Sequence, residues 1–166
     1  MSDGKGNVRI FSVNTRFQQM AKRPGGVPRD VAIQQAQTQI EGFKVEYVDW
    51  AERELDDLAA AFGQAKGPAI NDEQIETILS RCRQLRDTGS TMGLELLTFV
   101  AGNLCRVLEA IKAGAPYDPA MIECHIDALM LSKKMPYRNL RPDQLPEMTE
   151  GLNRVLERAN RLAEQG

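Results

Sequence analysis

The single histidine and the three cysteines are the side chains in this 166-residue chain best suited to chemistry. His125 is suited to nucleophilic attack or to proton transfer, because an unperturbed imidazole changes its charge near neutral pH. Cys82, Cys105 and Cys124 are far apart and form no Cys-x-x-Cys pair, so with one histidine they predict no metal site. Each cysteine lies among apolar residues of an expected helix, which favours a small buried side chain over a redox role.

His125 lies in the segment from Glu123 to Asp127, at the edge of the apolar stripe of an expected helix. We therefore expect a half-buried imidazole whose hydrogen-bond partner is the carboxylate of Glu123 or Asp127. The alternative interpretation is a phosphoacceptor, but no glycine and no small-residue turn follows it. Carboxylates elsewhere are spread along helix surfaces without an identifiable pair, so the residues predict no acid–base enzyme.

A second group of polar residues, Arg83, Arg86 and Asp87, comes just before a turn of small residues from Thr88 to Gly93. At about 100° per residue, Arg83 lies well away from the apolar stripe of its own expected helix and should face outward. A guanidinium stays protonated and has no free lone pair, so it cannot accept a phosphoryl group. It can form a bidentate pair with a carboxylate, which predicts docking. The alternative is an ordinary solvated helix face.

The stretch from Leu79 to Glu109 resembles the central helix pair of histidine-containing phosphotransfer (Hpt) domains. In that family the first helix carries His-x-x-Lys-Gly, and a small-residue turn, a glycine and a leucine-rich helix ending in Leu-Glu follow. Counting back from Gly93 places Arg83 at the phosphoacceptor position, Arg86 at the lysine and Asp87 at the glycine. The resemblance implies that the fold is kept and that the phosphotransfer chemistry is lost.

The resemblance also implies a bacterial two-component or phosphorelay role in which the chain binds without catalysing a reaction. The expected partner is a response-regulator receiver domain or a sensor kinase. The expected partner-binding residues are Arg83, Arg86, Asp87, Gly89 and Gly93. Two alternatives stay open: an active phosphotransfer protein that uses His125, and a general interaction or scaffold module unrelated to phosphorelay. No cofactor is expected, since there is no Walker A loop and no Gly-x-Gly-x-x-Gly motif.

Apolar residues at spacings of three and four predict five helices. The first runs from about Asp30 to the Gly67-Pro68 pair, and the second begins after Asn71, with Gln74 completing a capping box. The remaining helices are expected at about 92–111, from Pro119 to about 133, and from a start between residues 142 and 146. The apolar stripe expected along the first helix comprises Ile33, Ile40, Phe43, Tyr47, Ala51, Leu55, Leu58 and Phe62. The prediction is an all-α antiparallel four-helix bundle of Hpt type with an additional helix.

Composition places these helices in one domain, residues 30–166, preceded by an irregular basic arm, residues 1–29. Hydrophobic residues make up 42% of the chain and charged residues 27%, which is ordinary for a globular domain. Residues 1–27 carry five basic residues and one acidic residue, a net charge of +4, whereas the rest carries 16 and 22, a net charge of −6. So few separated charges predict no nucleic-acid partner. No apolar run spans a bilayer, and we expect a cytoplasmic protein without a membrane association.

Overall fold

A computed structural model describes residues 26–165 of the chain, with the side chain of Lys44 left aside. It consists of two units, residues 1–41 and residues 42–166, which we treat separately. Most of the predicted arm, residues 1–25, lies outside the described residues.

In the first unit, the described residues are the segment 26–28, which has no regular secondary structure, and the beginning of helix α2 (Arg29–Ala65), whose start agrees with the predicted one. Ile33 and Ile40 of this part of α2 are exposed, and so is Phe43 at the beginning of the second unit. The predicted apolar stripe of α2 is therefore buried only from Tyr47 onward. Periodicity identifies the apolar face of a helix, but it does not provide the partner that would cover that face.

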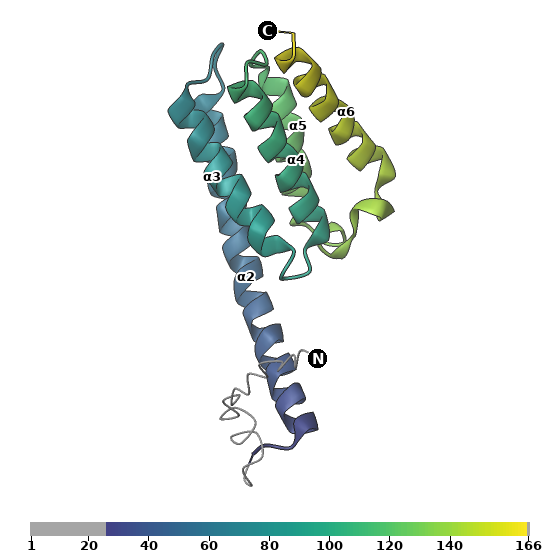
Figure 1. Cartoon of the computed structure of the whole chain (residues 1–166). Coiled ribbons are helices and arrows are strands. Elements are labelled where there is room, and N and C mark those ends of the chain that lie inside the picture. The colour runs from purple at the N-terminus through teal and green to yellow at the C-terminus, as the bar shows by residue number, and fades with distance from the viewer. Residues whose placement is uncertain (1–25, 166) are drawn as a thin grey trace, which may run out of the picture. The chain divides into compact units, whose positions relative to one another are not determined.

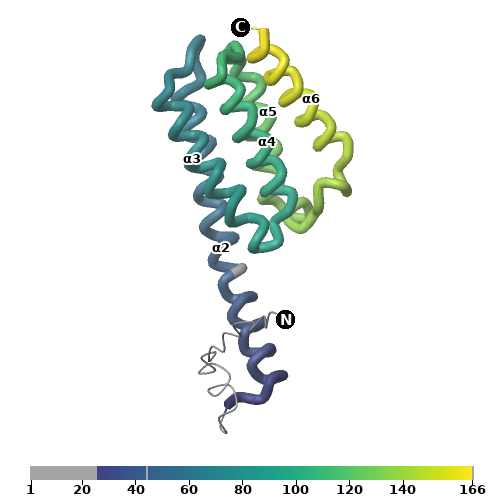
Figure 2. The backbone as a smooth tube through the Cα atoms, in the orientation of Figure 1, coloured from purple at the N-terminus to yellow at the C-terminus, as the bar shows by residue number. Residues whose placement is uncertain are grey.

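The second unit contains the remainder of α2 and four further helices. They are α3 (Asp72–Gly89), α4 (Glu95–Lys112), α5 (Pro119–Ser132) and α6 (Pro146–Ala163), with short 3₁₀ segments at Tyr137–Asn139 and Pro142–Gln144. Successive helices from α3 to α6 run in opposite directions, and α4 lies against α3, α5 and α6 (Figure 1). The same arrangement is visible in the backbone trace of Figure 2. The described residues contain no strand, and the all-α prediction is confirmed.

Local signals in the sequence determine where several of these helices begin. The Asn71 side chain accepts a hydrogen bond from the Gln74 backbone nitrogen at 2.8 Å, and the Gln74 side chain accepts one from the Asn71 nitrogen at 3.0 Å. The predicted capping box is thus present. Asp118 caps α5 by accepting a hydrogen bond from the Ala120 nitrogen at 3.0 Å, with Pro119 at the first helical position. Helix α6 begins at Pro146, within the predicted range.

The core of the second unit is aliphatic, and α4 contributes more buried residues to it than any other described helix. Residues of α2 reach it through Tyr47, Leu55 and Leu58, and the Tyr47 hydroxyl lies 2.9 Å from the Thr88 hydroxyl of α3. Fully buried large side chains include Ile78, Leu79, Leu85, Leu96, Val100, Leu104, Leu108, Ile122 and Leu129. This packing fixes the position of α3 against α4.

None of the described helices combines the length and the apolar character that crossing a lipid bilayer requires.

Candidate docking face on helices α3 and α4

The turn between α3 and α4 is built on two glycines. Helix α3 extends through Gly89, so the predicted turn starts at Ser90 instead of Thr88. The Gly89 carbonyl accepts a hydrogen bond from the Leu94 nitrogen at 2.9 Å, which closes the loop. Gly93 has a φ of 73°, in the left-handed region that L-residues rarely adopt, so a glycine is favoured there.

Gly89 also allows the two helices to approach each other closely. A Cβ atom added at this position would lie 2.6 Å from the Thr98 hydroxyl oxygen and 3.1 Å from a Leu97 methyl group. The Thr98 hydroxyl is already held by a 2.9 Å hydrogen bond to the Leu94 carbonyl. Because Gly89 is buried, its contribution to any docking is indirect, through the position of the turn.

Arg83 is exposed on α3, as its position on the helical wheel predicts. Its Nη2 atom donates a hydrogen bond to the Glu109 Oε1 atom of α4 at 2.9 Å. The side chains of Arg83 and Glu109 keep 44% and 47% of their surface accessible, so solvent reaches both partners of this ion pair. The hydrogen bond to Glu109 raises the pKa of the Arg83 guanidinium, which stays charged.

Arg86 and Asp87 form a second ion pair one turn further along α3, with Nε and Oδ1 2.8 Å apart. The aliphatic part of Arg86 crosses α4 at Gly102, where an added Cβ would lie 3.4 Å from the Arg86 Cδ atom. Arg86 is half-buried and Asp87 is exposed. Gly102 therefore gives the Arg86 stem a place to lie, while the guanidinium stays at the surface.

A third pair, between Lys112 of α4 and Glu76 of α3, completes a row of charges along the α3–α4 seam. The hydrogen bond from Lys112 lowers the pKa of the Glu76 carboxyl. We call the six residues that form these three pairs the charged face: Glu76, Arg83, Arg86, Asp87, Glu109 and Lys112. Three positive and three negative side chains balance, so these six residues carry no net charge together.

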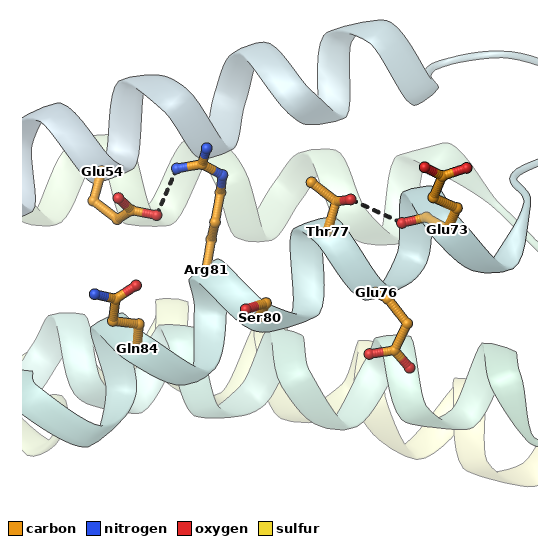
Figure 3. A pocket seen from close by; sticks show the side chains of 7 residues that line it. All are labelled: Glu54, Glu73, Glu76, Thr77, Ser80, Arg81 and Gln84. Atoms are coloured by element: carbon orange, nitrogen blue, oxygen red, sulfur yellow. Dashed lines mark hydrogen bonds and ion pairs between the residues drawn. The ribbon is translucent and has the colours of Figure 1, made fainter.

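Arg81 belongs to a different surface. It reaches toward α2, where its Nη1 atom lies 2.7 Å from Glu54 and 3.3 Å from Asp57. Figure 3 shows Arg81 directed at Glu54, beside an open polar depression between α2 and α3, while Glu76 points away from α2. The hydroxyls of Thr77 and Ser80 line this depression without a histidine or cysteine beside them. The Thr77 hydroxyl donates a hydrogen bond to the Glu73 backbone carbonyl at 2.8 Å.

His125 is fully buried, and the expectation of a half-buried ring paired with Glu123 or Asp127 is wrong. Its Nδ1 atom lies 2.6 Å from the Met121 carbonyl oxygen, and its Nε2 atom lies 2.9 Å from the Asn103 side chain of α4. Glu123 pairs instead with Lys66. Since both ring nitrogens are occupied and hidden from solvent, the alternative in which His125 accepts a phosphoryl group finds no support in this position.

The hydrogen bonds around His125 define its protonation. A carbonyl oxygen only accepts, so Nδ1 carries a proton and donates it to Met121. Burial lowers the pKa of His125, which favours a neutral ring whose Nε2 accepts. The Asn103 Oδ1 atom faces Nε2, and its Nδ2 atom donates a 2.8 Å hydrogen bond to the Oδ1 atom of Asn153 on α6. A neutral ring is satisfied when both amides are turned over, so that Asn103 donates to Nε2 and accepts from Asn153. This polar chain therefore connects α5, α4 and α6.

The cysteines behave as small core side chains. Cys82 of α3 and Cys105 of α4 are fully buried, as predicted, while Cys124 is half-buried, with its sulfur 3.2 Å from the Met121 carbonyl oxygen. A hydrogen bond with Cys105 and burial raise the pKa of the Cys82 thiol, which keeps it protonated and unreactive.

Sequence reasoning missed two residues that the structure brings to these sites. Asn103 is a polar residue on the apolar side of α4, at the spacing of its buried neighbours Val100 and Val107. Such a residue requires a hydrogen-bond partner inside the core, and His125 is that partner. Glu109 entered the sequence analysis only as part of a motif, whereas the structure pairs its carboxylate with Arg83.

Comparison of the chain with protein-family models, with curated proteins and with solved structures finds no match in any of the three.

Proposed function

We propose that this chain is a non-catalytic, Hpt-like helical bundle that docks on the acidic surface of a response-regulator receiver domain. The observation that carries the proposal is the exposed Arg83 guanidinium on a tightly packed helix pair. The resemblance to the Hpt motif aligns this residue with the phosphoacceptor. The four-helix arrangement of the Hpt type and the bacterial phosphorelay setting are parts of the same proposal.

Two physical features support docking through Arg83. The first is that its present partner, Glu109, holds it through a solvent-exposed ion pair, and exposed pairs contribute little to stability. Arg83 can therefore exchange Glu109 for a partner's carboxylate without a large loss elsewhere. The second is that Arg83 lies on a rigid helix that packs through fully buried Leu79, Cys82 and Leu85, so little conformational entropy of the backbone is lost on binding.

The same geometry argues against catalysis at this face. A guanidinium offers no lone pair to a phosphoryl group. Asp87 adds a negative charge at the position where the family has a glycine, and an anionic phosphoryl group is repelled there. The proposed function of Arg83 is therefore docking and not the transfer of a phosphoryl group.

Binding of purified receiver domains to the wild-type chain and to Arg83→Ala tests the proposal. Loss of a charge-assisted hydrogen bond should weaken binding by about ten- to a hundredfold. The matched control is Arg158→Ala, which removes an exposed arginine from α6 and should leave binding unchanged. If Arg83→Ala and Arg158→Ala both bind as strongly as the wild type at low and moderate salt, Arg83 has no docking role. The general interaction module then becomes the better description.

A further inference from the structure

Glu109 lies in the place that a partner's carboxylate must take. Its Oε1 atom accepts a hydrogen bond from the Arg83 Nη2 atom at 2.9 Å, and this nitrogen is one of the donors that a guanidinium offers to a bidentate acidic ligand. Both side chains are about half exposed, so the contact forms at the surface where a partner arrives. An incoming carboxylate must displace Glu109 before it can use the whole guanidinium fork.

Two further charged residues, Glu76 and Lys112, lie near the Arg83–Glu109 pair. Glu76 also acts on the charge of Arg83, although its own hydrogen-bond partner is Lys112. On α4, Lys112 follows Glu109 by less than one turn but is held by Glu76. A partner that carries carboxylates therefore approaches an arginine whose charge is offset mainly by Glu109, because Lys112 neutralises Glu76.

We propose that Glu109 is a positioning residue that restrains docking by competing, within the chain, for the Arg83 guanidinium. This inference rests on the proposed function and adds a requirement on the partner, whose carboxylates must displace one that already holds Arg83. The matched substitution is Glu109→Gln, which keeps the size of the side chain and removes its charge. We expect Glu109→Gln to bind a receiver domain about two- to fivefold more tightly than the wild type.

The experiment compares four proteins in one calorimetric titration series with an unphosphorylated receiver domain: wild type, Glu109→Gln, Arg83→Ala and the double variant. Glu150→Gln is the control, because it removes one negative charge from an exposed position on α6. Circular dichroism and thermal unfolding verify that each variant is folded. If Glu109 acts through Arg83, its substitution tightens binding in the wild-type background and changes nothing in the Arg83→Ala background.

Each other outcome overturns the inference. Equal tightening by Glu109→Gln and Glu150→Gln means that only the overall charge matters. Unchanged or weaker binding of Glu109→Gln, together with weak binding of Arg83→Ala, removes the competition but leaves the proposed docking function intact. If the wild type binds no receiver domain in a panel from the same genome, the proposed function fails, and the role of Glu109 fails with it.

Discussion

Replacing Gly89 by alanine tests the close packing of α3 and α4, on which the position of Arg83 depends. The added methyl group would lie 2.6 Å from the Thr98 hydroxyl and 3.1 Å from a Leu97 methyl group, and carbon atoms do not approach fixed neighbours so closely. Thr98 can move only by giving up its hydrogen bond to the Leu94 carbonyl. The strain must therefore be relieved by shifting α3 away from α4 or by rearranging both side chains.

The expected magnitude follows from three contributions. Overpacking costs about 1–3 kcal/mol, and loss of the Thr98 hydrogen bond costs about 1 kcal/mol. Alanine in place of glycine within a helix returns about 1 kcal/mol. We expect Gly89→Ala to lower the free energy of unfolding by about 1–3 kcal/mol. Gly63→Ala in α2 is the control, because an added Cβ there meets nothing within 4 Å.

The assay is urea unfolding of both variants, followed by circular dichroism, with the midpoints and slopes compared with those of the wild type. Gly63→Ala should be stabilised by up to about 1 kcal/mol, so the two alanine variants should differ by more than either differs from the wild type. If Gly89→Ala is as stable as Gly63→Ala, α3 and α4 are not packed as described, and the reasoning about Arg83 loses its structural basis.

Two further predictions concern the buried histidine and a helix cap. Burial lowers the pKa of His125 in the folded state, so on acidification the unfolded chain takes up a proton at this residue before the folded chain does. The contribution of the neutral ring to stability is therefore fully present above about pH 6.5, the ordinary pKa of histidine, and should be lost as the pH falls through the folded pKa. Urea midpoints measured at several pH values should show this loss of stability at a higher pH than the acid range in which Glu76 titrates. If His125→Gln loses as much stability over the same pH range, the loss does not come from His125. Asn71→Ala removes the side chain that accepts a hydrogen bond from Gln74 and should cost about 1 kcal/mol in thermal unfolding, whereas an unchanged melting temperature would mean that the cap contributes nothing.

The sequence predicted those features that depend on neighbouring residues. The capping box at Asn71, the proline start of α5 and the outward direction of Arg83 follow from residues within one or two turns, and all three are confirmed. Contacts between helices were harder to predict. His125 and Asn103 are separated by 22 positions, and their hydrogen bond depends on the rotation of α5 about its axis relative to α4. Periodicity predicts the buried face of each helix only to within part of a turn, so it does not determine this rotation.

The exposed stripe at the beginning of α2 shows the same limit. Ile33 and Ile40 have the spacing of core residues, yet they remain accessible to solvent. The spacing reports only which face of their own helix is apolar, whereas burial also requires a second element that packs against that face. The charged face contains one residue that the sequence identified and one that only the structure did. Arg83 was identified from a motif, whereas Glu109 acquires its importance only when α3 and α4 are placed side by side.

The most direct test of the central claim is to map where a receiver domain contacts this chain. Nuclear magnetic resonance titration of the isotopically labelled chain with an unlabelled receiver domain reports the contact surface residue by residue. We expect the largest changes in the amide signals of α3 and α4 around Arg83 and Glu109, and their loss in Arg83→Ala. Changes that centre on α6, or that persist in Arg83→Ala, would contradict the proposal that this chain docks through the charged face.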